Sequence, residues 1–326
     1  MSDKTGIAWT DATWNPVTGC SKVSQGCKLC YAEREWGRLS ANPKATNYYG
    51  RAFTDVACHE DRLDQPLRWK KPRMIFVNSM SDLFHEDVPD AFINKVFAVM
   101  ALAKQHTFQV LTKRPERMLR WFDPGFDNRE HAVGQAMREI AAARGGDDAG
   151  LPEWPLPNVW LGVSVEDQAT ADERIPLLLR APAAVRWISA EPILGRIDLE
   201  HVQLDEDTYY NALTGDTLML SHTIIPMENT LNWVVLGGES GNSARVLDAL
   251  HLRSLLMQCQ KAGTPVFVKQ LGYRFMDLDR VVYGAGVPTT DIARQLRNRA
   301  GADMDEWPED LRVREWPKEV EAWKTQ

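Results

Sequence analysis

Short apolar runs recur along the chain, and they constrain the fold more than any other feature of the sequence. Each is rich in β-branched and aromatic residues, and most are separated from the next by enough chain for a helix. Continuous apolar strands alternating with helices are typical of a parallel sheet covered on both faces. The runs are MIFV (74–77), TFQVL (107–111), VWLGV (159–163), VRWIS (185–189), WVVLG (233–237) and PVFV (265–268). GIAWT (6–10) is predicted to add a first strand.

Two of the intervening stretches have the spacing of helices with one apolar face. Residues 89–104 carry Phe92, Val96, Val99 and Met100, and residues 247–262 carry Leu250, Leu252, Leu255, Leu256 and Cys259. The fold class is therefore α/β with a parallel sheet. A partial or complete parallel (βα) TIM-like barrel and an open doubly wound sheet both fit this pattern, and the barrel is what the second resemblance described below implies.

Two segments interrupt the βα rhythm. Residues 196–231 contain short alternating runs and a Thr-Gly-Asp turn, which predict an inserted β-hairpin. Residues 272–326 end in a stretch rich in Trp, Pro and charge. We expect them to form a C-terminal extension packed on a barrel domain of residues 1–271.

Polar residues follow every apolar run at its C-terminal end. The segments are NSMSD, TKR, SVED, AEP, GES and KQLG. In βα barrels these strand ends form the rim of the active site, so the pattern favours a functional rim. The alternative is that the segments are ordinary solvated loops or halves of structural ion pairs.

Composition limits the compartment and the class of partner. The 326 residues include no apolar run near the roughly 20 residues of a membrane span, and the N-terminus has no signal-like apolar region. We therefore expect a cytoplasmic protein with no membrane partner. The formal net charge of −7 lacks the basic field of a nonspecific nucleic-acid binder, although a local basic groove is compatible with it.

Three of the five cysteines lie close together, as Cys20, Cys27 and Cys30 in a C-x6-C-x2-C pattern. An odd number of cysteines argues against a disulfide framework and for reduced thiols. Glycine precedes the first two, as in a loop that folds tightly around something. The three thiolates could hold zinc, with His59 or His85 as fourth ligand, or an iron–sulfur cluster with one iron left open. Structural thiols are the third alternative, and Cys58 and Cys259 are interpreted as ordinary.

Basic residues alternate with aromatic ones in two segments. RLDQPLRWKKPRM (62–74) and LTKRPERMLRW (111–121) combine Lys and Arg with Trp, which suits phosphate contact and base stacking. A solvated helix face is the alternative. The predicted nucleic-acid contacts are Arg68, Trp69, Lys70, Lys71 and Arg114.

Several segments resemble, in order, an uncharacterised three-cysteine family, a domain of unknown function whose members are widely described as phage proteins. They are GIAWTDATWNPVTGCSKVSQGCKLCYAE, NSMSDLFHEDVP, FQVLTKRPERM, VWLGVSVEDQ, RWISAEPILG, WVVLGGESG, VFVKQLG and WPEDLRVREWP. More distantly, the Cys-Tyr pair, the SDLF strand exit and the Thr-Lys after the next strand resemble radical S-adenosylmethionine (radical SAM) enzymes of the spore photoproduct lyase type.

The second resemblance implies a barrel with a 4Fe-4S cluster on Cys20, Cys27 and Cys30. The open iron binds S-adenosylmethionine, and one-electron reduction from an external donor releases a 5'-deoxyadenosyl radical. The superfamily's usual spacing is C-x3-C-x2-C, so the first gap is longer here. The resemblance places Tyr31 beside the cluster or adenine.

The strand exits supply the other expected site residues. Those expected to bind the cofactor are Ser79, Ser81, Asp82 and Ser164, and those expected to be catalytic are Lys113, Glu166 and Glu191. Lys269 could meet a carboxylate or phosphate.

Two functions follow as hypotheses. The first is a radical SAM enzyme, of lyase or transferase type, that modifies or repairs a nucleic acid or nucleotide. The second is a noncatalytic zinc- or cluster-binding phage protein associated with nucleic acid. A redox-inert cluster protein that serves a partner enzyme, which could be phage-encoded, is a further alternative.

Overall fold

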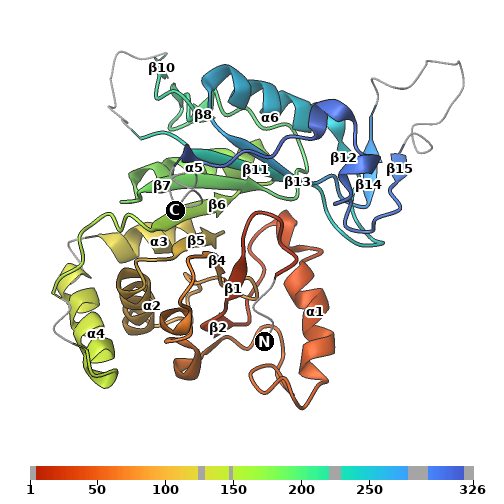
Figure 1. Ribbon diagram of the computed structural model, residues 1–326. Coiled ribbons are helices and arrows are strands. Elements are labelled where there is room, and N and C mark those ends of the chain that lie inside the picture. The colour runs from red at the N-terminus through yellow and green to blue at the C-terminus, as the bar shows by residue number, and fades with distance from the viewer. Residues whose placement is uncertain (1–4, 124–128, 147–149, 220–228, 278–292, 319–326) are drawn as a thin grey trace, which may run out of the picture. The chain divides into compact units, whose positions relative to one another are not determined.

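The predicted apolar runs form the central strands of the protein. The computed structural model describes residues 5–123, 129–146, 150–219, 229–277 and 293–318 (Figure 1). All six predicted runs are strands: β4 (Met74–Val77), β5 (Thr107–Thr112), β6 (Val159–Ser164), β7 (Val185–Ala190), β11 (Trp233–Gly237) and β13 (Val266–Gln270).

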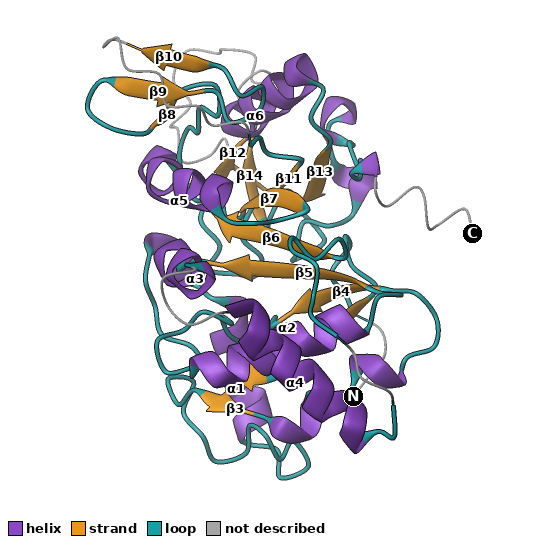
Figure 2. Ribbon diagram, turned by 90° about the vertical axis from the view of Figure 1, so that its left-hand side faces the viewer, coloured by secondary structure: helices purple, strands orange, loops and turns teal. Residues whose placement is uncertain are grey.

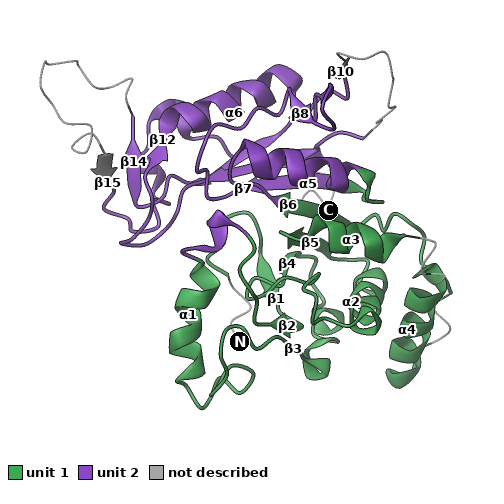
Figure 3. Cartoon of the chain, turned by 180° about the vertical axis from the view of Figure 1, so that it is seen from behind, with its two compact units in different colours: residues 1–23, 30–163, 180–185 green, residues 24–29, 164–179, 186–326 purple. Residues whose placement is uncertain are grey.

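The chain divides into two compact units, drawn in green and purple in Figure 3. Unit 1 comprises Met1–Val23, Cys30–Val163 and Arg180–Val185, and unit 2 comprises Ser24–Leu29, Ser164–Leu179 and Arg186–Gln326. The cysteine segment passes through both, because Cys20 and Cys30 belong to unit 1 and Cys27 to unit 2.

Unit 1 contains four parallel strands in the order β1-β4-β5-β6. The first strand is β1 (Ala12–Trp14). It begins after residues 6–10, so the prediction of a strand at GIAWT is wrong. Thr10 explains the difference: its amide bonds to the carbonyl of Ile7 in a turn and its hydroxyl to the carbonyl of Met74. Such local and side-chain hydrogen bonds compete with a strand ladder.

The helices of unit 1 are α1 (Tyr31–Ser40), α2 (Asp90–Leu102), α3 (Pro115–Phe122) and α4 (Arg129–Ala143). All four residues predicted for the apolar face of α2 are buried. Helix α2 packs against α4, and the two lie side by side in Figures 1 and 2. A small antiparallel sheet joins β2 (Val17–Thr18) to β3 (Ala57–Cys58), and three 3-10 turns lie at Gln25–Cys27, Glu60–Arg62 and Pro66–Arg68.

Unit 2 contains three parallel strands in the order β7-β11-β13, together with α5 (Gln168–Arg180) and α6 (Ala249–Ala262). Helix α6 packs on β11 and β13. Its predicted apolar face is confirmed except for Leu250, which is 42% exposed. Leu250 lies two residues before the buried Leu252, which turns it to roughly the opposite side of the helix.

The predicted hairpin within residues 196–231 is present, because two strands pair antiparallel on either side of the Thr-Gly-Asp turn, and a third strand extends the pair. The strands β8 (Val202–Gln203), β9 (Thr208–Tyr210) and β10 (Thr217–Met219) form a three-stranded sheet (Figure 2). The rest of the predicted insertion includes residues 220–228, which lie outside the described residues.

The C-terminal part of the chain pairs with both a small sheet and a central strand of unit 2. A second three-stranded sheet joins β12 (Leu247–Asp248), β14 (Arg274–Met276) and β15 (Ala293–Gln295). After 3-10 turns at Met304–Glu306 and Glu309–Leu311, residues 313–315 run antiparallel to β13. The Val268 amide donates to the Val313 carbonyl, and the Glu315 amide donates to the Val266 carbonyl. Residues 278–292 and 319–326 of the predicted extension lie outside the described residues.

The α/β class with parallel strands is thus confirmed, whereas a TIM-like barrel stays a prediction. Among the described residues, none of the helices has both the length and the apolar character needed to span a bilayer.

Candidate functional site

Cys20 follows a glycine that the backbone requires. Gly19 has a φ of 92°, and a Cβ there would lie 2.4 Å from the Asp55 carbonyl oxygen. The Gly19 amide donates to the Met80 carbonyl at 3.1 Å, and the Cys20 amide donates to the Phe53 carbonyl at 2.9 Å. This tight turn places Cys20 beside the residues that follow β4.

Arg114 contacts the cysteine segment directly. One guanidinium nitrogen, Nη1, lies 3.7 Å from Cys20 Sγ. The other, Nη2, donates to the Ser21 carbonyl at 3.1 Å and to Ser21 Oγ at 2.8 Å. The side chain is buried, at 7% exposed. A buried cation therefore touches both the first predicted ligand and the residue after it.

Asp82 forms a buried ion pair with this arginine. Its Oδ2 accepts from Arg114 Nη1 at 3.2 Å and from the Lys113 amide at 3.0 Å, and its Oδ1 accepts from Thr112 Oγ1 at 2.8 Å. Burial lowers the pKa of Arg114, but Asp82 and Cys20 raise it by more, so the pKa is raised overall. The residues come from the carboxyl ends of β4 and β5 and hold the guanidinium charged and fixed.

His85 joins the group of Cys20, Ser21, Asp82 and Arg114 in unit 1 through its contact with Ser21. Its Nε2 lies 2.8 Å from Ser21 Oγ, and its Nδ1 accepts from the Asp87 amide at 3.1 Å. Burial, aided by Arg114, lowers the pKa of this imidazole. A neutral ring that donates from Nε2 to Ser21 fits both contacts.

Tyr31, Ser79 and Ser81 lie around the same strand exit. The Tyr31 hydroxyl donates to the Ser79 carbonyl, while its ring is partly exposed. Ser79 Oγ donates to Asn15 Oδ1 at 3.1 Å, and Ser81 Oγ donates to the Val17 carbonyl at 2.8 Å. The three predicted cofactor contacts are thus near one another, and each has a hydrogen bond within unit 1.

Cys30 is the N-cap residue of helix α1, and its carbonyl accepts from the Arg34 amide at 3.1 Å. It packs against a buried cluster that includes Trp36, Tyr48 and Met80. The third cysteine is therefore anchored by hydrophobic packing.

In unit 2, the turn that carries Cys27 lies against Glu166. Ser24 Oγ donates to Glu166 Oε1 at 3.0 Å and lies 3.7 Å from Cys27 Sγ. A Cβ at Gly26 would lie 2.4 Å from Glu166 Oε1. Only glycine allows the turn to approach the carboxylate this closely.

Arg174 of α5 supports this carboxylate. Its Nη1 lies 3.2 Å from Glu166 Oε2 and donates to the Ser164 carbonyl at 2.8 Å. Both side chains of the pair are almost fully buried, at 2% and 1% exposed. The predicted site residues Ser164 and Glu166 therefore belong to a buried structural network that also holds the cysteine turn.

A second predicted carboxylate pairs with a lysine at the ends of β7 and β13. Lys269 Nζ lies 3.0 Å from Glu191 Oε1, and Ser189 Oγ donates to Glu191 Oε2 at 3.1 Å. Gly237 allows the approach, since a Cβ there would lie 2.6 Å from Glu191 Oε1.

The basic segment lies at the other end of β4 from Asp82, because residues 68–71 precede the strand and Asp82 follows it. Lys70 and Lys71 are exposed, and Arg68 is exposed and ion-paired with Asp64. Trp69 is half-buried beneath the guanidinium of Arg73, which lies 4.8 Å from the ring centroid. Arg114, the fifth predicted contact, is instead in the cluster beside Cys20. The nucleic-acid role of all five stays a prediction.

Residues that sequence reasoning missed are Ser21, Ser24 and Arg174. Both serines lie inside the cysteine segment, where proximity to a predicted ligand is the only local signal. Arg174 has none, because its pairing with Glu166 depends on how α5 packs.

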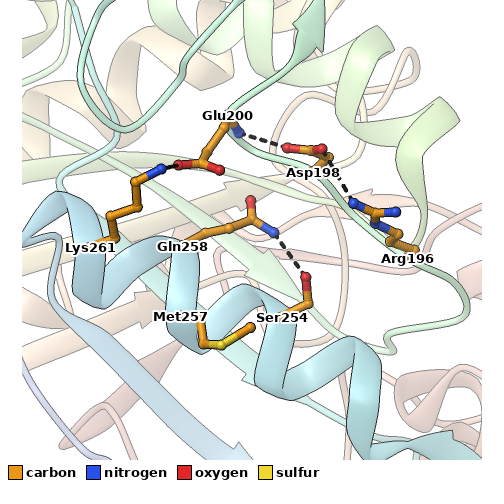
Figure 4. Close-up of a pocket in the computed structure, with 7 residues that line it drawn as sticks. All are labelled: Arg196, Asp198, Glu200, Ser254, Met257, Gln258 and Lys261. Atoms are coloured by element: carbon orange, nitrogen blue, oxygen red, sulfur yellow. Dashed lines mark hydrogen bonds and ion pairs between the residues drawn. The ribbon is translucent and has the colours of Figure 1, made fainter.

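A separate hollow of about 260 Å³ lies in unit 2 between α6 and residues 196–200 (Figure 4). Its charges are paired: Lys261 with Glu200 at 2.7 Å, and Arg196 with Asp198 at 3.7 Å. None of the predicted site residues lines it.

The donor set has the chemistry of a thiolate metal site. None of the five cysteines forms a disulfide, and Cys20, Cys27 and Cys30 are each partly exposed. Within the residues that the structure describes, no three His, Cys, Asp or Glu side chains are already grouped to hold a metal ion. Of the three cysteines, Cys20 lies beside the fixed guanidinium of Arg114, and a neighbouring cation stabilises a thiolate.

The comparison with protein families gives one match. No curated protein and no solved structure matches the chain. A family model described as "Protein of unknown function (DUF5131)" matches residues 4–309, which include the whole cysteine segment and all of the central strands. The chain therefore belongs to this uncharacterised family.

Proposed function

We propose that the protein is an iron–sulfur, S-adenosylmethionine-dependent radical enzyme that modifies or repairs a nucleic acid or nucleotide. Its fold would be a partial or complete βα barrel of the radical SAM type. The observation that carries the proposal is the cysteine segment. It has three partly exposed thiols in C-x6-C-x2-C spacing, and the first lies beside a buried arginine at the carboxyl ends of parallel strands.

Cys20, Cys27 and Cys30 would hold a 4Fe-4S cluster through their sulfurs. When bound, that group would supply one electron to S-adenosylmethionine, so that cleavage of the S–C5' bond would give methionine and a 5'-deoxyadenosyl radical. The external donor of the electron is a partner of unassigned identity.

The chain's own residues would bind and orient the cofactor. Tyr31 presents a partly exposed ring next to Cys30, suited to stacking on adenine. Ser79 and Ser81 leave β4 nearby and offer hydroxyl groups to a ribose or amine. Lys113, Glu191 and Lys269 are the candidates for contact with the substrate, because they stand at strand ends and are not fully buried.

The contacts of Asp82, Ser164 and Glu166 favour supporting roles in this enzyme. The three residues belong to two buried networks, and both networks touch the cysteine segment. A general acid or base must reach the proton that it moves, and a carboxylate 1% exposed and paired with Arg174 has little access.

The nucleic-acid part of the proposal rests on the basic segment. Lys70 and Lys71 are exposed beside Trp69, a combination suited to phosphate contact with stacking. Because the segment lies at the opposite end of β4 from Asp82, it would bind a part of a polymer remote from the reacting nucleotide.

The experiment is anaerobic reconstitution with iron and sulfide, followed by dithionite and S-adenosylmethionine, with 5'-deoxyadenosine measured by chromatography. We expect a brown protein that forms 5'-deoxyadenosine, and no product from a variant with Cys20, Cys27 and Cys30 changed to alanine. Cys58→Ala is the matched control, since this thiol lies outside the segment. A loaded and reducible cluster that gives no 5'-deoxyadenosine would overturn the radical chemistry.

A noncatalytic zinc protein is the second candidate, and one observation favours it. His85 lies 2.8 Å from Ser21 Oγ, next to Cys20, and is the better placed of the two histidines considered as a fourth ligand. His59 instead bonds to Thr18 and Asn47. Colourless protein with one zinc per chain, and loss of that zinc in His85→Ala, would support this function over the first.

A further inference from the structure

The buried pair of Asp82 and Arg114 suggests a specific role within the proposed metal site. Arg114 donates hydrogen bonds to three atoms of two consecutive residues: Cys20 Sγ, Ser21 Oγ and the Ser21 carbonyl oxygen. A guanidinium presents five donors in a rigid planar fork, whereas a lysine ammonium is a compact point charge with three donors and no fixed fork geometry.

The carboxylate behind it fixes where that fork points. Asp82 is buried and accepts from Arg114, from the Lys113 amide and from Thr112 Oγ1. The Thr112 hydroxyl also accepts from the Arg114 amide at 2.9 Å, so strand end and side chain are locked together. The guanidinium cannot move without breaking a buried ion pair, which is costly.

We infer that Arg114 is a positioning residue, which holds Cys20 and Ser21 in place before any metal arrives and which lies against the metal-bound sulfur afterwards. Only the contact with a metal-bound sulfur rests on the proposed function. The positioning of Cys20 and Ser21 concerns the metal-free chain.

Two consequences separate a positioning role from a general contribution to folding. In the metal-free protein, loss of the fork should release the amides of Gly19 and Cys20, whose partners are the Met80 and Phe53 carbonyls. In the loaded protein, loss of a cation beside a ligand sulfur should make the midpoint potential of the cluster more negative, because positive charge favours the reduced state.

The test uses the full-length chain and four proteins: wild type, Arg114→Met, Arg114→Lys and Arg129→Met. Arg129 is the matched control, because it is also buried in unit 1 and paired with an aspartate, Asp90, at 3.1 Å, and its other hydrogen bonds go to Trp121 and Asn94. Hydrogen exchange of the metal-free proteins is followed over residues 17–24. Iron content and midpoint potential are measured after reconstitution.

We expect exchange about tenfold faster in Arg114→Met and unchanged in Arg129→Met, the size expected for losing hydrogen bonds to a charged donor. Arg114→Lys should restore the potential, which depends on charge, but not the protection, which depends on the fork. Unchanged exchange in Arg114→Met, or equal loosening in Arg129→Met, would overturn the inference. Because Arg114→Met leaves a buried carboxylate, the double variant Asp82→Asn/Arg114→Met is a second probe, and the same loosening is expected in it.

The two proposals fail in distinguishable ways. If the wild type takes up no iron and sulfide, the proposed enzyme is wrong, and the exchange of the metal-free proteins still decides whether Arg114 positions the segment. If the wild type loads and the potential is the same in Arg114→Met, the contact with the ligand sulfur is wrong.

Discussion

Two buried arginine–carboxylate pairs meet the cysteine segment, and they do so with opposite polarity. In unit 1 the arginine faces the segment and Asp82 stands behind it. In unit 2 the carboxylate of Glu166 faces the segment and Arg174 stands behind it. Cys20 therefore lies beside positive charge, whereas the Cys27 turn is held by a serine hydrogen bond and by close packing.

The contrast teaches that the same pair of side chains can serve two tasks. A cation turned toward a sulfur can compensate the charge of a thiolate. A carboxylate turned toward a serine and a glycine can only fix the backbone, since its charge would repel a thiolate. We therefore expect the unit 2 pair to act on stability and the unit 1 pair to act also on the proposed metal site.

The largest effect is expected from Arg174→Met, which removes the buried cation beside Glu166. Breaking such a pair from one side costs about 3–5 kcal/mol, because the remaining charge stays buried. Urea denaturation followed by tryptophan fluorescence measures the loss. Adding Glu166→Gln should recover most of it; a single variant as stable as the wild type would mean that the pair contributes little.

The second effect is a dependence of stability on pH that His59 of unit 1 is expected to cause. Burial is the main cause that lowers the pKa of His59 from 6.5 to about 4, and its ring contacts Thr18 Oγ1 at 2.7 Å, close to Cys20 in the chain. The unfolded chain takes up this proton first as pH falls. The contribution of His59 to the free energy of unfolding is therefore expected to be full above pH 6.5, to fall between pH 6.5 and 4, and to level off below that.

The drop assigned to His59 is at most about 3 kcal/mol, from the size of the shift. It is measured as the difference in urea unfolding between wild type and His59→Gln across this range, since His85 and His106 also have lowered pKa values. Parallel pH curves for the two proteins would contradict the assignment.

The smallest effect is expected from Gly26→Ala, which places a methyl group against Glu166. Overpacking of this kind costs about 1–3 kcal/mol and should displace the turn that carries Cys27. Unfolding free energy and hydrogen exchange over residues 24–29 report it. Gly37→Ala is the matched control: a Cβ there meets nothing within 4 Å, so in helix α1 we expect a gain of up to about 1 kcal/mol. Equal effects at the two glycines would show that the turn is not tightly packed.

The strands could be predicted closely because their signal is local. Every residue of MIFV is buried in β4, and the apolar letters alone mark its limits. The same reasoning failed at GIAWT, where a turn and the Thr10 hydroxyl take the place of a strand ladder. It also failed at Leu250, which the apolar pattern of the helix includes although the side chain is exposed.

The candidate site could be predicted only in part. The three cysteines and their glycines stand out in the sequence, and the structure gives a reason for both Gly19 and Gly26. The partners could not be foreseen, because Arg114 is 94 residues from Cys20 and Glu166 is 142 residues from Ser24. Such pairings depend on how strands and helices pack, and a basic residue in a Lys–Arg–Pro run gives no sign that it will be buried.

The short antiparallel segment beside β13 has a consequence for solubility. Among the described strands β13 pairs with β11 alone, so its other side would present free amides and carbonyls as a template for another chain. Residues 313–315 occupy that side, and the Trp233 indole donates to the Glu315 carbonyl at 2.9 Å to hold them there. A chain shortened before residue 313 would expose an apolar edge, and self-association through added strands, rather than loss of the fold, is the failure that it invites.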